Sequence, residues 1–167
     1  MSRIAWLVAL VLFIVAPAAL GASPKNLTRL QLDYDAAVFD VDEDAPTPGG
    51  GAFSIFGKRA MVSLMVQEMG PAPSDVTVDA MLANLQRGDT VATGTLTLGN
   101  KGPAGWSCRT DIADMKGPGV TQVLKCFTLV DGHGFVIIAL TSDEASDPAS
   151  LAALKAAIAS IRAVPAP

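Results

Sequence analysis

The chain has two cysteines, Cys108 and Cys126, and their spacing limits the chemistry that they can perform. A redox dithiol of the thioredoxin type has the pattern Cys-x-x-Cys at the start of a helix, whereas residues 109–125 lie between these two. A structural zinc site is almost always four-coordinate, and the chain supplies two cysteines and one histidine. The sequence therefore matches neither a redox motif nor a zinc motif.

A β-hairpin accounts for the same spacing. We expect strands at 106–115 and 120–130, joined by a glycine- and proline-rich turn. Folding this hairpin about its turn places residue 108 opposite residue 126, where opposed Cβ atoms lie about 4.5–5.5 Å apart. A disulfide needs about 3.5–4.5 Å, so a small adjustment closes the bond. We predict a structural Cys108–Cys126 disulfide that contributes about 3 kcal/mol by restricting the unfolded chain.

His133 is the single histidine of the chain and lies in the stretch Asp-Gly-His-Gly. A catalytic histidine needs a nucleophile and an orienting group around it, and neither is recognisable in the sequence. The G-x-S-x-G motif of the α/β-hydrolases is also missing from the sequence. We predict that His133 is a solvated turn residue, with a functional role as the alternative, because histidine titrates near neutral pH.

An acidic run comprises Asp40, Asp42, Glu43 and Asp44. Its D-x-D-x-D spacing is that of the start of an EF-hand loop, which then requires glycine at the sixth position and glutamate at the twelfth. Ala45 and Gly51 occupy those positions, so the calcium pattern fails. The sequence predicts a solvated loop over 42–51, and the best functional use of its negative charge is contact with a basic protein partner.

Two further polar patterns fall short of a site. Asp33 and Asp35 form a carboxylate pair of the kind that glycoside hydrolysis uses, but strand alternation places both on one polar face, which usually faces solvent. A phosphate loop requires Ser or Thr after its lysine, and Arg59 follows Lys58. The sequence therefore predicts no catalytic residue, no bound metal and no cofactor.

Apolar side chains follow the acidic run in the stretch "GGGAFSIFGK". Phe53, Ile55 and Phe56 lie between glycines, so we expect a loop whose apolar side chains either fold back into the core or form an exposed contact surface. With the acidic run, they are our candidate partner-binding residues. Trp106 adjoins the predicted disulfide, and we expect it to pack in the core, although tryptophan also marks interface hot spots.

The first residues of the chain have a different composition from the rest. A short positive start is followed by an apolar run over 4–20 and by small residues, which is the pattern of a secretory signal peptide over 1–22, cleaved after Gly21 or Ala22. An uncleaved anchor is the alternative, but a spanning helix needs about 20 apolar residues and this run is shorter. We expect a single domain over 23–164, a short tail over 165–167, and an exported protein that is periplasmic in a Gram-negative bacterium or secreted.

The charge of the mature domain restricts its partners. Without the signal segment, 11 of the 12 basic residues remain against 16 acidic ones, which gives a net charge of −5. Neutralisation of phosphates by Lys and Arg supplies most nucleic-acid affinity, so we expect no nucleic acid as a partner. An acidic domain is equally unsuited to anionic membranes once the signal is removed. The sequence does not determine the oligomeric state.

The elements that must position these residues can be read from periodicity. Alternating or β-branched stretches predict strands at 30–41 (one long strand with a bulge near 36–37, or two short ones), 59–69, 90–98, 106–115, 120–130 and 135–141. Val78, Met81, Leu82 and Leu85 form one apolar stripe of a helix over 77–87.

A second helix closes the domain. Asp147 is a suitable N-cap and Pro148 suits the first helical position. Leu151, Leu154, Ile158 and Ile161 fall on one face. Consecutive strands joined by tight turns predict an antiparallel sheet of about five or six strands, on which the two amphipathic helices pack. The predicted fold class is α+β, with one disulfide.

Three stretches carry a resemblance to a known family. They are "VTVDAMLANLQRG", the meander over 90–140 with "CFTLVDGHGFVIIAL" at its end, and "DPASLAALKAAIASIRAV", and together they cover most of 76–164. This order resembles the PsbP-like sandwich superfamily, which includes the extrinsic PsbP protein of photosystem II and many small exported bacterial proteins. The resemblance implies a non-catalytic binding or assembly module. It transfers no site residue, because no functional motif is matched, and the stretch "DAPTPGGGAF" has no counterpart in it.

These observations lead to one functional hypothesis and two alternatives. We expect a small exported, non-catalytic module that contacts a protein partner with a basic surface. An immunity-type role, in which the acidic domain caps a basic toxin, is one specific form of it. The alternatives are a periplasmic hydrolase that uses Asp33, Asp35 or His133, and a carrier of a small ligand or metal with a carboxylate site.

Overall fold

The computed structural model describes residues 27, 29–43, 51–85, 102–113, 121–142 and 147–164 of the chain. Within these residues, two helices and eight strands form the fold. In chain order these are β1 (Leu30–Gln31), β2 (Phe39–Glu43), β3 (Ala52–Gly57), β4 (Val62–Pro71), α1 (Val78–Leu85), β5 (Ser107–Ala113), β6 (Thr121–Val130), β7 (His133–Ser142), α2 (Pro148–Ser160) and β8 (Arg162–Ala163). The predicted α+β class is therefore confirmed.

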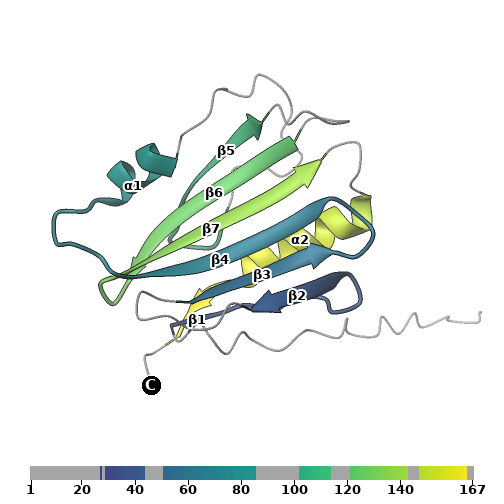
Figure 1. Cartoon of the computed structure of the whole chain (residues 1–167), viewed down its shortest axis with the longest axis horizontal. Coiled ribbons are helices and arrows are strands. Elements are labelled where there is room, and N and C mark those ends of the chain that lie inside the picture. Colours follow the sequence, from purple (N-terminus) through teal and green to yellow (C-terminus); the bar gives the residue numbers. More distant parts are fainter. Residues whose placement is uncertain are drawn as a thin grey trace, which may run out of the picture.

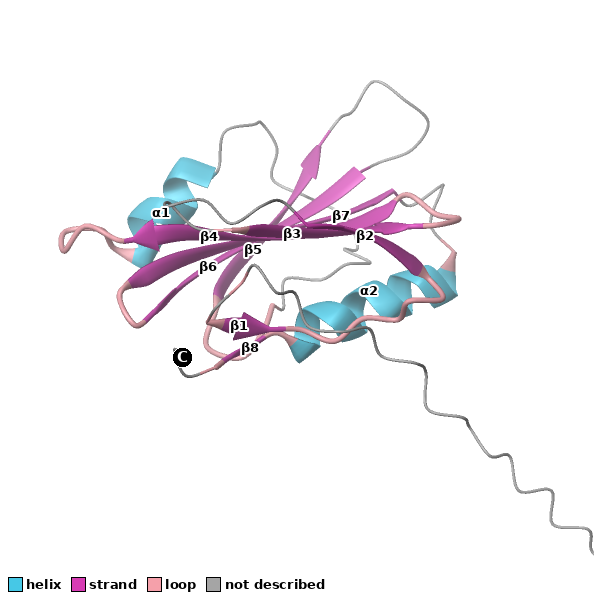
Figure 2. Ribbon diagram, turned by 60° about the horizontal axis from the view of Figure 1, so that its bottom comes forward, coloured by secondary structure: helices cyan, strands magenta, loops and turns pink. Residues whose placement is uncertain are grey.

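Six strands form one antiparallel sheet with the order β2-β3-β4-β7-β6-β5, and β1 pairs with β8 in a separate two-stranded sheet. Seen nearly edge-on in Figure 2, the large sheet has α2 and the small sheet on one side and α1 on the other. We call the side that α2 covers the inner face and the opposite side the outer face. The two predicted helices thus pack on opposite faces of the sheet, whose strand order can be followed in Figure 1.

Alternation along the strands sends large apolar side chains to the inner face. On β4, Val62, Leu64 and Val66 are buried, and they alternate with more accessible residues. Leu154 and Ile158 of α2 are buried in the same core cluster. Burial of an aliphatic side chain of this size stabilises a fold by about 1.5–3 kcal/mol, so this single inner core holds the two layers together.

The start and the apolar stripe of α2 agree with the sequence prediction. Asp147 is the N-cap, and its carboxylate accepts hydrogen bonds from the backbone N–H groups of Ala149 and Ser150. Pro148 takes the first helical position, where a missing N–H group has no cost. The helix ends at Ser160, and the following Ile161 is buried in the core.

Of the two alternatives that we gave for 30–41, one bulged strand or two short strands, the structure shows two short strands. Residues 36–38 form a turn between β1 and β2. The carboxylate of Asp35 accepts the N–H of Ala37, and the carbonyl of Asp35 accepts the N–H groups of Val38 and Phe39. An aspartate that bonds to the backbone two residues ahead favours a turn over a continuous strand, which is the physical reason for the break.

The stretch that we expected as a loop around Phe53 is the strand β3. It pairs with β2 on one side and with β4 on the other, so it lies inside the sheet. Burial alternates along it with a period of two, which the preceding glycines concealed in the sequence. The predicted strand over 90–98 and the turn over 116–119 lie outside the described residues.

Candidate functional site

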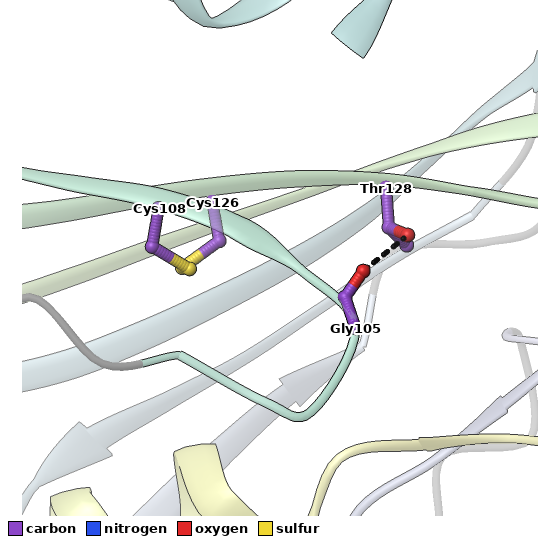
Figure 3. The surroundings of a disulfide bond; sticks show 4 residues. All are labelled: Gly105, Cys108, Cys126 and Thr128. Atoms are coloured by element: carbon purple, nitrogen blue, oxygen red, sulfur yellow. Dashed lines mark hydrogen bonds between the residues drawn. A yellow bond between two sulfur atoms is a disulfide. The ribbon is translucent and has the colours of Figure 1, made fainter.

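The two cysteines form the predicted disulfide. Cys108 on β5 lies directly opposite Cys126 on β6, with 4.1 Å between their Cα atoms. Figure 3 shows the bond beneath the two strands, with the loop that carries Gly105 passing close by. A Cβ atom added at Gly102 would collide with both sulfur atoms, so this loop packs directly on the bond. Trp106 is partly buried against the core beside it, as we expected.

The prediction that His133 is a solvated turn residue is wrong. His133 is the first residue of β7 and pairs with both neighbouring strands. Its Nδ1 lies 3.2 Å from Oε1 of Glu68, whose side chain is only 6% exposed. Arg29 donates to the same carboxylate oxygen at 3.0 Å. The histidine therefore belongs to a partly buried cluster around Glu68 that ties the N-terminal segment to β4 and β7.

The carboxylates of Asp33 and Asp35 serve separate local contacts. Asp33 accepts a hydrogen bond from Arg162 of β8 at 3.0 Å, and its backbone exchanges two hydrogen bonds with the hydroxyl of Ser160. Asp35 caps the turn that follows it. Both residues thus stabilise local structure, Asp33 at β8 and Asp35 in the turn, and they do not line one shared cavity.

Three of the four acidic residues lie on a strand, so the predicted loop over 42–51 is wrong at Asp42 and Glu43. Asp42 and Glu43 are the last two residues of β2, the edge strand of the large sheet, and Asp44 lies outside the described residues. Asp40 and Asp42 point to the outer face and are exposed. Lys58 lies 3.7 Å from the carboxylate of Asp40, which nevertheless remains 74% exposed. Both carboxylates therefore face solvent at one sheet edge.

The three apolar candidates separate according to the face of β3 that they occupy. Phe53 and Ile55 have no exposed surface, so they are core residues, and their proposed role as contact residues is wrong. Phe56 points to the outer face and is 48% exposed. The register places Phe56 opposite Asp40 of β2 and Ser63 of β4. The structure thus brings one of the three apolar candidates, Phe56, next to the acidic residues of the edge strand β2.

An apolar cavity of about 260 Å³ opens beside Phe56. It lies where the connection between β3 and β4 meets the end of β7. Met61, at its rim, is 58% exposed. The lining residues come from three segments and are Phe56, Gly57, Ala60, Met61, Val62, Ser63, Leu140, Thr141 and Ser142. Most of these residues are apolar, and none carries a charge.

Sequence reasoning missed the part of this cavity that β7 contributes. Leu140 stands opposite Ser63 in the register, although 77 positions separate them in the chain. No local pattern reveals such a contact. Met61 gave no separate signal, because it fell within the predicted strand over 59–69.

The outer face continues across the sheet as a row of cross-strand neighbours. From the edge strand β2 to the opposite edge strand β5, this row is Asp40, Phe56, Ser63, Leu140, Val123 and Asp111. Asp111 is buried and accepts hydrogen bonds from Arg109 at 2.8 Å and Lys125 at 3.2 Å. An acidic edge, an apolar centre and a neutralised ionic cluster therefore follow one another on this face.

A second cavity, of about 140 Å³, lies between the end of β4 and α1. Met69, Met81 and Phe127 are among its lining residues. Because α1 forms one wall, this space is the partly filled junction of the helix with the outer face. It is smaller than the cavity beside Phe56, and none of the described residues that line it carries a charge.

The comparisons with known proteins give no family. No known protein-family model matches the chain, and no curated protein matches its sequence. In the part of the chain that the structure describes, no helix is long and apolar enough to cross a membrane. The same residues contain no group of three or more His, Cys, Asp or Glu side chains that could hold a metal ion.

Proposed function

We propose that the chain is a small exported, non-catalytic binding module that contacts a basic segment of a protein partner through its outer face. The proposal rests on one observation: the exposed carboxylates of Asp40 and Asp42 lie at the edge of the same face that exposes Phe56 and Met61 beside an apolar cavity. We call these four residues and the cavity the acidic–apolar face. A membership of the PsbP-like superfamily would agree with such a role and stays a proposal.

The chemistry of this face favours a partner with mixed character. Interfaces combine an apolar centre with a polar rim, and charges at the rim steer association and select partners. Two carboxylates beside an apolar cavity suit a segment in which Lys or Arg flanks a large apolar side chain. The net charge of the chain, −4, also favours association with a basic partner.

The disulfide supports export. Disulfides persist in oxidising compartments and are rare in the reducing cytosol. The Cys108–Cys126 bond is directly opposed in the hairpin and has a loop packed against it, so it forms part of the folded structure. The periplasm or the cell exterior is therefore the compartment that we propose.

The alternative functions have less support. A hydrolase that uses Asp33, Asp35 or His133 would need them in one cavity, and neither of the two cavities described above is lined by any of them. A carrier with a carboxylate site would need carboxylates around its ligand, and none of the described residues that line the larger cavity is a carboxylate.

The proposal can be tested with a random-peptide library displayed on phage, selected against the purified protein. We expect selected peptides to carry Lys or Arg next to a bulky apolar residue. The double variant Asp40→Asn with Asp42→Asn should weaken their binding about tenfold at low salt, and less at high salt, because exposed charges are screened.

A matched control removes the same charge elsewhere. Asp75→Asn with Asp79→Asn changes two exposed carboxylates near α1 and should leave peptide binding unaffected. Selected peptides without basic residues, or equal losses in the two double variants, would overturn the proposal, because binding would then not depend on the acidic edge.

A further inference from the structure

We propose that the cavity beside Phe56 receives a tyrosine or tryptophan side chain from the basic partner segment, with the polar tip of that side chain bonded to the hydroxyl of Ser142. This inference rests on the proposed function and names the chemistry that the same face recognises. It follows from the size of the cavity, from an unsatisfied hydroxyl on a residue that lines it and from the carboxylates of Asp40 and Asp42 next to its rim.

The volume of the cavity suits one aromatic side chain. An apolar cavity of about 150 Å³ is large enough to hold benzene, whereas pockets for drug-sized ligands measure about 300–1,000 Å³. The cavity described here measures about 260 Å³ and lies between these values. It can therefore take a substituted ring such as a phenol or an indole, and it is small for a complete cofactor.

The hydroxyl of Ser142 indicates that the ligand has a polar tip. Ser142 is only 1% exposed, it lines the cavity, and its Oγ has no hydrogen-bond partner among the described residues. Its backbone N–H is already used, since it donates to the carbonyl of Met61 at 3.1 Å. A buried polar group without a partner is rare and costly, so a hydrogen bond supplied by a ligand is a direct explanation.

The location of Ser142 on the strand is consistent with this role. It is the last residue of β7, and alternation places it on the outer face with Leu140, which also lines the cavity. The cavity walls are otherwise mostly apolar. A ring with a single polar atom fits this pattern, because tyrosine and tryptophan combine an apolar body with one hydrogen-bonding group and find a partner for it when they are buried.

The rim connects this cavity to the acidic edge. Phe56 lines the cavity and lies directly opposite Asp40 in the register. A partner segment that inserts an aromatic ring into the cavity would therefore lie next to the carboxylate of Asp40. Basic residues next to the inserted ring would meet Asp40 and Asp42. Trp, Tyr and Arg are the residues most enriched in binding hot spots, and this combination is the one that the face can accommodate.

The experiment compares defined peptides on the full chain, expressed with its N-terminal segment so that the host processes it as it does other exported proteins. The probes are the peptides Lys-Lys-Xaa-Lys-Lys, in which Xaa is Tyr, Trp, Phe or Ala. Binding is followed by nuclear magnetic resonance, and the backbone amides of Met61 and Ser142 report on the cavity. We expect the Tyr peptide to bind about fivefold more tightly than the Phe peptide, as one additional hydrogen bond predicts.

The variant Ser142→Ala removes the hydroxyl and fills no space, so the difference between the Tyr and Phe peptides should disappear in it. A second variant, Ser63→Leu, places bulk in the cavity and should weaken the Tyr, Trp and Phe peptides to the level of the Ala peptide. Thermal melting of both variants verifies folding. The comparison of Tyr with Phe on the unchanged protein needs no variant.

Two failures can be distinguished. If the Tyr and Phe peptides bind equally well and the Asp40→Asn, Asp42→Asn variant weakens both, the role of Ser142 is wrong while the acidic–apolar face stands. If no basic peptide moves the Met61 and Ser142 signals, or if the acidic variant has no effect, the proposed function fails together with this inference.

Discussion

Two phenylalanines on one strand, Phe53 and Phe56, have opposite roles because β3 alternates its side chains between two faces. Phe53 is buried, and its ring packs against Tyr34 with 5.8 Å between the ring centroids. Phe56 faces solvent beside Asp40 and the cavity. Whether an apolar residue is buried in the core or available for contact depends on the face that it occupies, and the residue type alone does not determine this.

This difference gives a prediction at the residue scale. Phe53→Ala leaves a hole in the inner core and should lower the free energy of unfolding by about 3–5 kcal/mol. Phe56→Ala removes an exposed ring and should change it by less than about 1 kcal/mol, while it weakens peptide binding. Urea unfolding and the peptide titration measure the two effects. Similar losses of stability in both variants would contradict the assignment of faces.

The ionic cluster around Glu68 shows what local sequence cannot reveal. Arg29, Glu68 and His133 come from three distant segments, and 104 positions separate Arg29 from His133. The sequence predicted a turn at His133 because its glycine neighbours are turn residues, whereas the cross-strand pairing there is set by the sheet. Buried charges of this kind need partners, and those partners become visible only once the fold is known.

At the scale of elements, the β5–β6 hairpin depends on the disulfide that fastens it. Replacing both cysteines by alanine should lower the free energy of unfolding by about 3 kcal/mol, chiefly because the unfolded chain regains freedom. Urea midpoints of the two proteins measure this loss. An unchanged midpoint would show that the bond does not stabilise the fold.

The neighbouring glycine gives an independent test of the same packing. Gly102→Ala should destabilise the disulfide-bonded protein, because the added Cβ would meet both sulfur atoms. In the Cys108→Ala, Cys126→Ala background the same change should cost clearly less, since both sulfur atoms are gone. A double-mutant cycle of urea midpoints measures the coupling, and equal effects in both backgrounds would contradict the contact.

The start of α2 has a pH-dependent component. Hydrogen bonds from the hydroxyl of Ser150, and then from the N–H groups of Ser150 and Ala149, hold the pKa of Asp147 below its ordinary value of 3.8. A carboxyl whose pKa is lowered on folding stabilises the fold above its ordinary pKa and loses that contribution as the pH falls through the lowered value.

The variant Asp147→Asn can still accept a hydrogen bond but does not titrate in this range. The wild type should therefore be more stable than this variant near neutral pH, and the difference should shrink as the pH falls below about 4. Urea midpoints of both proteins across this range give the comparison. A difference that stays constant into acid would show that the carboxylate does not act as the cap.

The elements that the sequence predicted well are those with strong local signals. Cysteine spacing with a turn between two apolar runs predicted the hairpin, and Asp147 with Pro148 predicted the start of α2. Local signals misled where glycine and proline surround a strand, as they do at β3. The candidate site was half predicted: the acidic residues and Phe56 could be found, but the contribution of Ser142 and Leu140 depends on a pairing between β4 and β7 that no local pattern encodes.

At the scale of the whole molecule, the two faces of the large sheet differ in what covers them. The inner face, covered by α2 and the small sheet, holds the core, and the disulfide fastens its β5–β6 edge. The outer face carries α1 over β5 and β6, whose places in the sheet Figures 1 and 2 show. The acidic–apolar face lies toward the β2 edge. The proposed binding surface can therefore be altered without disturbing the inner core.

The most direct test of the central claim is photocrosslinking in cells of the source organism. The photoreactive amino acid benzoylphenylalanine is placed at Phe56, on the acidic–apolar face, or at exposed Ala152, on α2, as the control. We predict a crosslinked protein at Phe56 that is lost with Asp40→Asn and Asp42→Asn, and whose attached segment, read by mass spectrometry, carries Lys or Arg beside Tyr or Trp. Crosslinks that form at Ala152 and not at Phe56, or an attached segment that is acidic, would contradict the account.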